Sequence, residues 1–517
     1  MKRSTCSYLL AGLISGVSCL SASAGEPKIV VGIMVDQLRT DYLDRLAPQM
    51  GASGFNRLKA EGVTIPNLDF KATVTDLPSA AAVVYTGAWP SLTGVAGSQV
   101  YDTERHRSVP TLSAKGAKND FSPEGLQLST IADELVISSG PLSKIYSIAG
   151  DAQTAVVTAG HAANAAIWLD DFTGRWVSPA YYTGMPPVVA NKNRTAPITA
   201  TLSSTSWRPL SYPAGNQADN FSHTFNGAGH EAIIRFKNSP LFNSEIANAA
   251  IDLLRTLKQS SAASTPMLNV SFSLAPYIYD DNGDSRAELA DAYLRLDKDL
   301  GRILDALYSE YGRDNVLLFL SSSGYAQEPQ IPEGDVRLPV GEVSYKKMES
   351  LLNSYLSATY GNADYVSHIH DGNLYLNTSA IAAKGADIRK LRADAKAFLL
   401  RMSGIASIGT IDEVLGSDMA SMRGIALRIN PKSAPDLIVQ FAPGWTVVDD
   451  NQYPVTSFKV RLAAPATPAF ILAPGIEPQT VETPVDATAV APTVCSLIRI
   501  RAPNGAADPG IGLIGNK

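Results

Sequence analysis

Asp36 is the residue whose position in the sequence best suits it to chemistry. It ends the apolar run Ile29 to Asp36 (IVVGIMVD), whose β-branched residues predict a strand buried on both faces of a parallel sheet. In open α/β sheets, catalytic and binding groups gather just beyond the carboxyl ends of such strands. The alternative is an aspartate that only caps the helix expected from about Leu38. The residues that other segments bring to Asp36 must decide between the two.

Two other segments carry residue types that bind metal ions. His368 and His370 are separated by one residue, and in a strand this spacing puts both imidazoles on one face. The pair is then either half of a metal site or ordinary exposed polar alternation. The run 280–284 (DDNGD) begins like a calcium loop, but Ser285 and Asp291 stand where such a loop needs Gly and Glu. These departures favour a turn before the next helix.

An alternation of buried strands and amphipathic helices would position these residues. Helical spacing or small-residue content predicts helices at 80–85, 244–257, 285–311 and 388–402. Short apolar runs predict strands at 267–272, 315–320, 436–441 and 469–473. The alternation predicts an α/β fold with a largely parallel central sheet.

The composition changes over residues 98–235, which are richer in Gly, Pro, Ser, Thr and Asn. This change predicts an inserted cap region within one domain that spans residues 25–517.

The first 24 residues have the pattern of a secretory signal peptide. Lys2 and Arg3 precede an apolar stretch, and Ala22 to Ala24 (ASA) is a cleavage signal, so we expect export to the periplasm or beyond by the Sec route. Cys19 is not expected to carry a lipid, because the residues before it make a poor lipobox. After the signal only Cys495 remains, which rules out an internal disulfide or a cysteine-based metal site in the mature chain.

Composition excludes some classes of function. The formal net charge is −6 and no run of five basic residues occurs, which argues against nucleic-acid and anionic-membrane binding. No segment after the signal is long and apolar enough to span a bilayer, so we expect no transmembrane segment in the mature chain. With 45% hydrophobic residues the chain can build a large core without disulfides.

Several motifs resemble those of a known superfamily. They are VGIMVDQLRTDYL at 31–43, YTG at 85–87, AGHAANAAIW at 159–168, VSFS at 270–273, DAYLRLDKDL at 291–300 and LFL at 318–320. On these the chain resembles the alkaline phosphatase superfamily, especially bacterial periplasmic members of the type I phosphodiesterase/nucleotide pyrophosphatase group. The resemblance implies an α/β/α sandwich and two zinc ions held by Asp and His. It also implies a Thr or Ser nucleophile activated by one of the zinc ions.

The nucleophile position implied by the resemblance is ambiguous. Counting forward from Thr73 gives Thr75, counting back from Pro78 gives Asp76, and counting back from the YTG motif gives Leu77.

Most zinc-ligand positions implied by the resemblance hold residues that cannot bind zinc. Asp36 is retained, and Asp280 offers an oxygen where the family has His. The degenerate positions are Pro276, Ser323 with Gly324 (or Ser322 with Ser323) and Ala466. Without a ligand set, we expect no cofactor.

The positions that contact phosphate in the family are also changed. An Asn becomes Ser98, and a Lys and an Arg become Asp151 and Gln153, so the cationic clamp is absent.

These losses predict a catalytically inactive member, or pseudoenzyme, that acts in the cell envelope with a protein or glycan partner. The alternative is a divergent zinc-dependent phosphomonoesterase, phosphodiesterase or sulfate-ester hydrolase that uses Asp36, Asp280, Thr75 or Asp76, and a relocated histidine. His370 and His161 are the candidates for that histidine, although His161 suits a framework role. A calcium-stabilised structural protein is a third possibility, resting on residues 280–284 alone.

Overall fold

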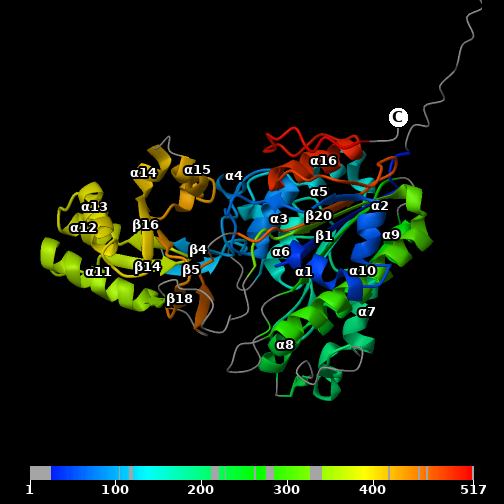
Figure 1. The fold of residues 1–517 in the computed structure, drawn as a ribbon, viewed down its shortest axis with the longest axis horizontal. Coiled ribbons are helices and arrows are strands. Elements are labelled where there is room, and N and C mark those ends of the chain that lie inside the picture. The colour runs from blue at the N-terminus through cyan, green and yellow to red at the C-terminus, as the bar shows by residue number, and fades with distance from the viewer. Residues whose placement is uncertain are drawn as a thin grey trace, which may run out of the picture.

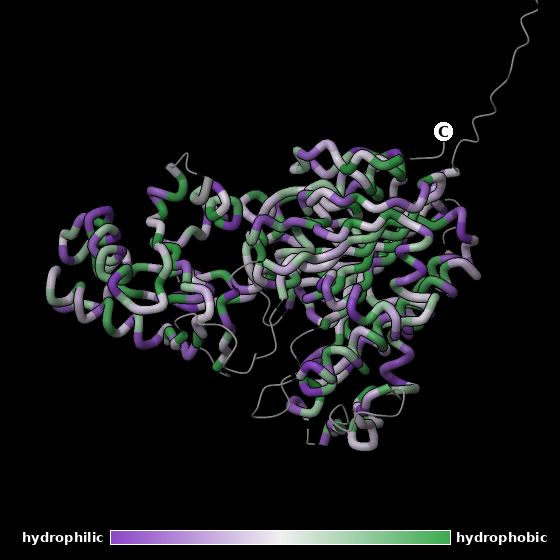
Figure 2. Tube along the Cα trace, viewed as in Figure 1, coloured by the Kyte–Doolittle hydropathy of each residue, from purple (hydrophilic) through white to green (hydrophobic). Residues whose placement is uncertain are grey.

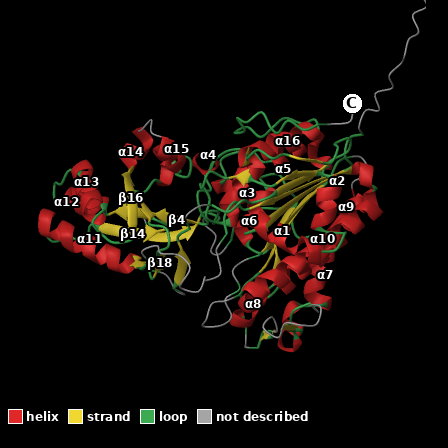
Figure 3. Cartoon of the chain, viewed as in Figure 1, coloured by secondary structure: helices red, strands yellow, loops and turns green. Residues whose placement is uncertain are grey.

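The computed structural model describes residues 25–103, 105–115, 120–210, 221–226, 229–260, 264–274, 277, 285–326, 340–416, 420–451, 455–461 and 464–514. Its centre is one nine-stranded sheet between two layers of helices (Figures 1 and 3). In sheet order the strands are β21 (Gln479–Thr480), β2 (Val63–Ile65), β20 (Ala469–Leu472), β12 (Val316–Ser322), β1 (Ile29–Asp36), β11 (Met267–Ser273), β6 (Ile145–Ala149), β7 (Ala165–Leu169) and β8 (Trp176–Val177). The strands from β12 to β7 run parallel. The predicted α/β fold with a largely parallel sheet is therefore confirmed.

The alternating residues of β1 point into two different cores. Ile33 and Val35 pack with one face of helices, and Val30 and Met34 pack with the other. The first face is covered by α1 (Thr40–Leu46), α2 (Phe55–Glu61), α7 (Pro187–Thr195), α8 (His230–Lys237), α9 (Pro240–Ser260) and α10 (Arg286–Tyr311). The second is covered by α3 (Leu77–Thr86), α5 (Ile131–Ser139), α6 (Ala152–Ala159) and α16 (Val490–Leu497). Because both faces are covered, the strand reads as an unbroken apolar run.

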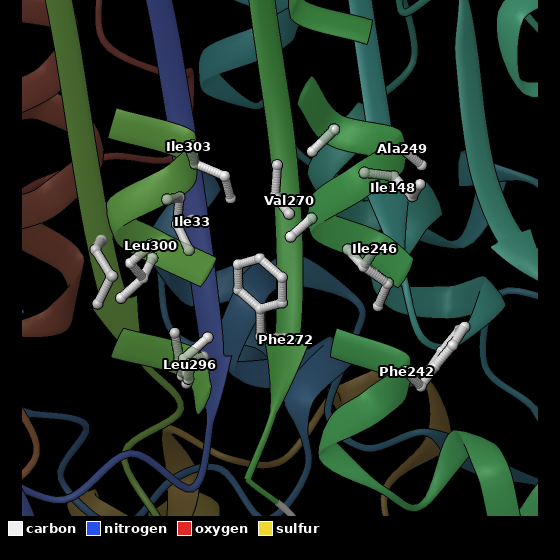
Figure 4. Packing of buried hydrophobic residues seen from close by; sticks show 14 of the residues in the cluster. Ile33, Ile148, Phe242, Ile246, Ala249, Val270, Phe272, Leu296, Leu300 and Ile303 are labelled. Atoms are coloured by element: carbon white, nitrogen blue, oxygen red, sulfur yellow. The ribbon is translucent and has the colours of Figure 1, made fainter. Parts of the chain in front are cut away.

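The first core shows how the amphipathic helices close on the sheet. Apolar side chains of α9 and α10 meet those of β1, β11 and β6. Figure 4 labels the helix residues Phe242, Ile246, Ala249, Leu296, Leu300 and Ile303. It also labels the strand residues Ile33, Ile148, Val270 and Phe272. In Figure 2 the hydrophobic colour follows the central strands, with polar residues on the outer helices.

A second lobe with its own core lies beside this sandwich, at the left of Figure 1. One of its sheets has the order β14 (Val366–His370), β15 (Asn373–Leu376), β17 (Leu437–Phe441), β16 (Ile405–Thr410). The other has the order β13 (Glu342–Ser344), β18 (Thr446–Asp449), β19 (Thr456–Lys459). Its helices are α11 (Tyr345–Tyr360), α12 (Thr378–Ala383), α13 (Ile388–Leu399), α14 (Ile411–Gly416) and α15 (Ala420–Ala426). The strand predicted at 436–441 is β17 and belongs to this lobe.

The position of the lobe differs from the composition-based expectation. Residues 98–235 contribute β6, β7 and β8 to the central sheet, so most of that range is not an inserted cap. Several of its described Gly and Pro residues, such as Gly160, Gly174 and Pro179, lie in connections outside the helices and strands. The hairpin of β4 (Gln99–Asp102) and β5 (Arg107–Pro110) does reach the second lobe, where Ser108 Oγ lies 2.8 Å from His368 Nε2. The short helix α4 (Pro90–Thr93) precedes this hairpin.

Hydropathy along the helices bears on membrane insertion. Among the described residues, no helix is both long enough and apolar enough to cross a bilayer.

Candidate functional site

The carboxyl ends of β1 and β12 form what we call the Asp36 edge, made of Asp36, Ser322, Ser323, Gly324 and Tyr325. Asp36 is only 9% exposed, and its Oδ1 has no hydrogen-bond partner among the described residues. Burial raises the pKa of Asp36 to about 6, although the side chains of Tyr325, Ser323 and Gln37 lie close enough to lower it in part. The edge therefore holds a carboxyl group that is poorly solvated when ionised.

The family positions at the end of β12 and just after it build a tight turn. Ser323 Oγ accepts a hydrogen bond of 2.8 Å from the backbone N–H of Gln37, which joins the ends of the two strands. Gly324 has a φ of +76°, and a Cβ there would lie 2.1 Å from Cδ2 of Phe70. Ser322 is fully buried, and its hydroxyl has no partner in the described structure. This turn carries the chain to Tyr325, beside Asp36.

The three nucleophile candidates have different surroundings at the start of α3. Leu77 is the first helical residue, is buried and has no nucleophilic group. Asp76 is the N-cap, and its Oδ1 accepts from the backbone N–H of Ser79 at 2.9 Å while its Oδ2 accepts from the N–H of Ser98 at 2.7 Å. Thr75 is exposed, and its hydroxyl donates to Oδ2 of Asp371 in the second lobe at 2.9 Å. Thr75 is thus the one hydroxyl among the three, and it is bonded to a carboxylate of the other lobe.

The residues at the family's cationic positions hold loops together. Asp151 caps α6 by accepting from the N–H of Thr154 at 2.9 Å. Gln153 accepts from the N–H of Leu112 at 3.0 Å and donates to the carbonyl of Ser98 at 2.8 Å. Ser98 is therefore fixed between Gln153 and Asp76. Each of these contacts is structural, and Asp151 adds negative charge where the resemblance implies a phosphate.

The remaining predicted positions fall into two groups. Ala466 uses its carbonyl to accept from the N–H of Thr40 at 3.0 Å, and its methyl side chain offers no ligand. Pro276, Asp280 and the possible calcium loop at 280–284 lie outside the described residues, so their roles stay predictions.

The fold family implies zinc, and the donors at the Asp36 edge can be compared with what zinc requires. Zinc sites use about four N, S or carboxylate ligands. In the described part of the chain, no group of three or more His, Cys, Asp or Glu residues is arranged to hold a metal ion. Asp36 is surrounded mainly by the hydroxyls of Ser323 and Tyr325. The described residues therefore do not fit a zinc ion.

The histidines are engaged elsewhere. His161 lies 3.0 Å from Oδ2 of Asp133 through Nδ1 and 3.0 Å from the carbonyl of Leu126 through Nε2, which makes it part of the framework. His368 stacks on Tyr101, with ring centroids 5.0 Å apart, where the two lobes meet. The rings of His368 and His370 do share one face of β14, but they stack nearly parallel 6.3 Å apart.

A second site, which we call the inter-lobe pocket, lies between the start of α3 and the second lobe. It has a volume of about 180 Å³, and its polar lining includes Thr75, Asp76, Ser98, Tyr345, His370, Asp371 and Asp449. His370 Nδ1 lies 2.9 Å from Oδ2 of Asp449. Tyr345 and Asp449 were not predicted from the sequence, because they are distant from each other along the chain and carry no motif. The sequence did point to His370 by its alternation with His368, and to Thr75, Asp76 and Ser98 by the resemblance.

Known proteins resemble the chain over nearly its whole length. The family model for type I phosphodiesterase / nucleotide pyrophosphatase matches residues 30–464. A protein named calcium-transporting ATPase from Myroides odoratus is 29% identical over 93% of both chains. Alkaline phosphatase PhoV from Synechococcus elongatus is 26% identical over 94% of this chain and 93% of its own. Alkaline phosphatase PafA from Elizabethkingia meningoseptica is 26% identical over 93% of both chains. The crystal structure of PafA superposes with a TM-score of 0.81, at 24% identity, over 94% of this chain and 98% of its own.

Proposed function

The chain belongs to the type I phosphodiesterase / nucleotide pyrophosphatase family and has an alkaline phosphatase-like fold. We propose that it is a catalytically inactive member of this family. In this proposal the chain has lost the two-zinc hydrolysis of phosphate esters and acts as a binding or assembly component. Family membership alone does not carry activity, because function depends on the site rather than on the fold.

The observation that carries the proposal is the donor set at the Asp36 edge. Where the family needs Asp and His ligands, the described chain offers Asp36 beside the hydroxyls of Ser323 and Tyr325. Two-zinc hydrolysis needs both ions, because they activate the nucleophile and neutralise the charge that develops in the transition state. One carboxylate with hydroxyl neighbours cannot supply this.

Local charge supports the same proposal. Asp76 and Asp151 are carboxylates at the starts of two helices on the α3 face, and Tyr325 lies near both of them and near Asp36. Anionic substrates would meet repulsion here, whereas a phosphatase site stabilises negative charge.

The cellular setting in this proposal rests on residues 1–24, which lie outside the described residues. A signal peptide there would place the mature chain in the cell envelope, where a protein or glycan is the expected partner.

An active phosphoric-ester hydrolase is the second candidate. It is favoured by full-length similarity to proteins named alkaline phosphatase. Such activity would need Asp280 or other residues outside the described ranges to complete a metal site with Asp36, with Thr75 as nucleophile.

Metal content and turnover together separate the two candidates. The mature chain is purified with zinc offered throughout, analysed for bound metal and assayed on p-nitrophenyl phosphate and bis-p-nitrophenyl phosphate. We expect no stoichiometric zinc, and no turnover that differs between wild type, Asp36→Ala and the exposed control Asp364→Ala. About two zinc ions per chain, with turnover that only Asp36→Ala abolishes, would refute the proposal and establish the hydrolase.

A further inference from the structure

The inter-lobe pocket combines groups from two parts of the chain. Thr75 and Asp76 come from the start of α3, and His370, Asp371 and Asp449 come from the second lobe. The bond between Thr75 and Asp371 bridges the two walls. At about 180 Å³, the pocket is smaller than the roughly 300–1,000 Å³ of sites for drug-sized ligands. It suits one small polar group or ring rather than a large substrate.

The charge of the lining points to a cationic ligand. Asp76, Asp371 and Asp449 contribute three carboxylates, and among the described residues no Lys or Arg lines the pocket. Arg428 approaches Asp371 to 3.6 Å, but it lines the neighbouring groove rather than this pocket. A phosphate would be repelled, whereas an ammonium group would gain charge-assisted hydrogen bonds.

A buried hydroxyl gives a second and independent indication. Tyr345 is 1% exposed and lines the pocket, and its hydroxyl oxygen accepts from the backbone N–H of Gly372 at 3.0 Å. Among the described residues, no acceptor takes the proton of that hydroxyl. Leaving a buried donor unsatisfied costs free energy, so a ligand that offers an acceptor here would be favoured. An alkylammonium ion cannot accept this bond, but a sugar hydroxyl can.

We propose that the inter-lobe pocket binds a single amino-sugar unit with a free amine. The ammonium group would lie among the carboxylates of Asp371, Asp76 and Asp449, and a ring hydroxyl would accept from Tyr345. The half-buried side chain of Phe458, which also lines the pocket, supplies apolar surface on which a sugar ring packs. This inference rests on the proposed binding role and gives a chemical class to its glycan partner.

Titration of the mature full-length chain with glucosamine, followed by NMR or calorimetry, tests the proposal. We expect saturable binding that is at least about tenfold weaker for N-acetylglucosamine and for glucose, because both lack the positive charge. Asp371→Asn should weaken glucosamine binding by a similar factor, and Tyr345→Phe should weaken it severalfold. The control Asp364→Asn, an exposed carboxylate of the same lobe outside the lining, should leave it unchanged.

Other results would overturn the inference. Equal affinity for glucosamine and N-acetylglucosamine would show that the ammonium group does not contribute to binding. Competition by inorganic phosphate would show that the pocket binds anions instead. No saturable binding by the folded wild type would also reject it. If Asp371→Asn does not fold, the ligand series on wild type and the Tyr345→Phe variant still decide. Phosphoester turnover is measured separately, so an active enzyme that still binds glucosamine would refute only the proposed function.

Discussion

The Asp36 edge lies at the carboxyl ends of β1 and β12, and the inter-lobe pocket lies between the start of α3 and the second lobe. The two differ in how their polar groups are used. At the Asp36 edge a carboxyl group is buried, poorly solvated and covered by a turn with hydroxyl side chains. In the inter-lobe pocket the carboxylates face an open volume and have defined partners on two lobes.

The difference teaches that two groups of polar residues beside one framework can be organised in different ways. The parallel strands still end where ligands bind in α/β folds. At the ends of β1 and β12, however, the chain uses that location for packing and strand joining. In our proposal, the polar groups that recognise a ligand lie instead where α3 meets the second lobe.

Packing of the Asp36 edge can be tested most strongly at Gly324. Alanine at Gly324 must adopt a left-handed backbone and place its Cβ into Phe70, so we expect a loss of about 2–5 kcal/mol in unfolding free energy. Gly385 in the second lobe has a φ of +61°, and a Cβ there would have no atom within 4 Å, so Gly385→Ala should cost only about 1–2 kcal/mol. Urea unfolding measures both. Equal costs would show that the turn beside Asp36 is not tightly packed.

Ionisation of Asp36 gives the next largest effect. Its pKa is about 6 in the folded chain against an ordinary value of 3.8, so the unfolded chain loses its proton first as pH rises. Relative to pH 4 and below, ionisation of Asp36 therefore lowers the free energy of unfolding between about pH 4 and 6, by about 3 kcal/mol in total. Asp36→Asn should remove this loss and make the chain more stable than wild type at pH 8, with little difference at pH 4.

Thermal unfolding across this pH range, with a chelator present, checks the effect of Asp36→Asn. The exposed control Asp364→Asn should follow the wild-type curve. Destabilisation by Asp36→Asn at pH 8 would show that the ionised carboxylate has a stabilising partner within the chain.

The sequence was sufficient for the central fold, because its signal is local. The apolar run at β1 and the helical spacing of α10 each report burial directly, and the structure has both elements close to their predicted bounds. The second lobe was missed because amino-acid composition does not say which connection carries a separate core. Gly- and Pro-rich connections occur between sheet strands as well as in inserted lobes.

The site was harder to predict because it depends on contacts between distant segments. Spacing in the sequence could not choose between Thr75, Asp76 and Leu77, whereas the structure assigns the cap to Asp76 and the exposed hydroxyl to Thr75. Nothing near Tyr345 or Asp449 signals a pocket, since these residues meet only through the fold of the second lobe.

The smallest expected effect is the pH-dependent stabilisation by His161, a histidine of the framework rather than of the inter-lobe pocket. Both ring nitrogens of His161 face acceptors, the carboxylate of Asp133 and the carbonyl of Leu126, so the doubly protonated ring satisfies both. The hydrogen bond to Asp133 raises the pKa of His161 despite partial burial. Its stabilisation is therefore complete below the ordinary pKa of about 6.5 and is lost as pH rises through the raised value. Because the side chain is 35% exposed, we expect this stabilisation to be less than about 1 kcal/mol.

His161→Gln should flatten the pH dependence of thermal stability between pH 6 and 9, while the variant His230→Gln, at an exposed histidine, should retain it. A wild-type profile that is already flat would mean that His161 is held as a neutral ring, with one of its two contacts unbonded.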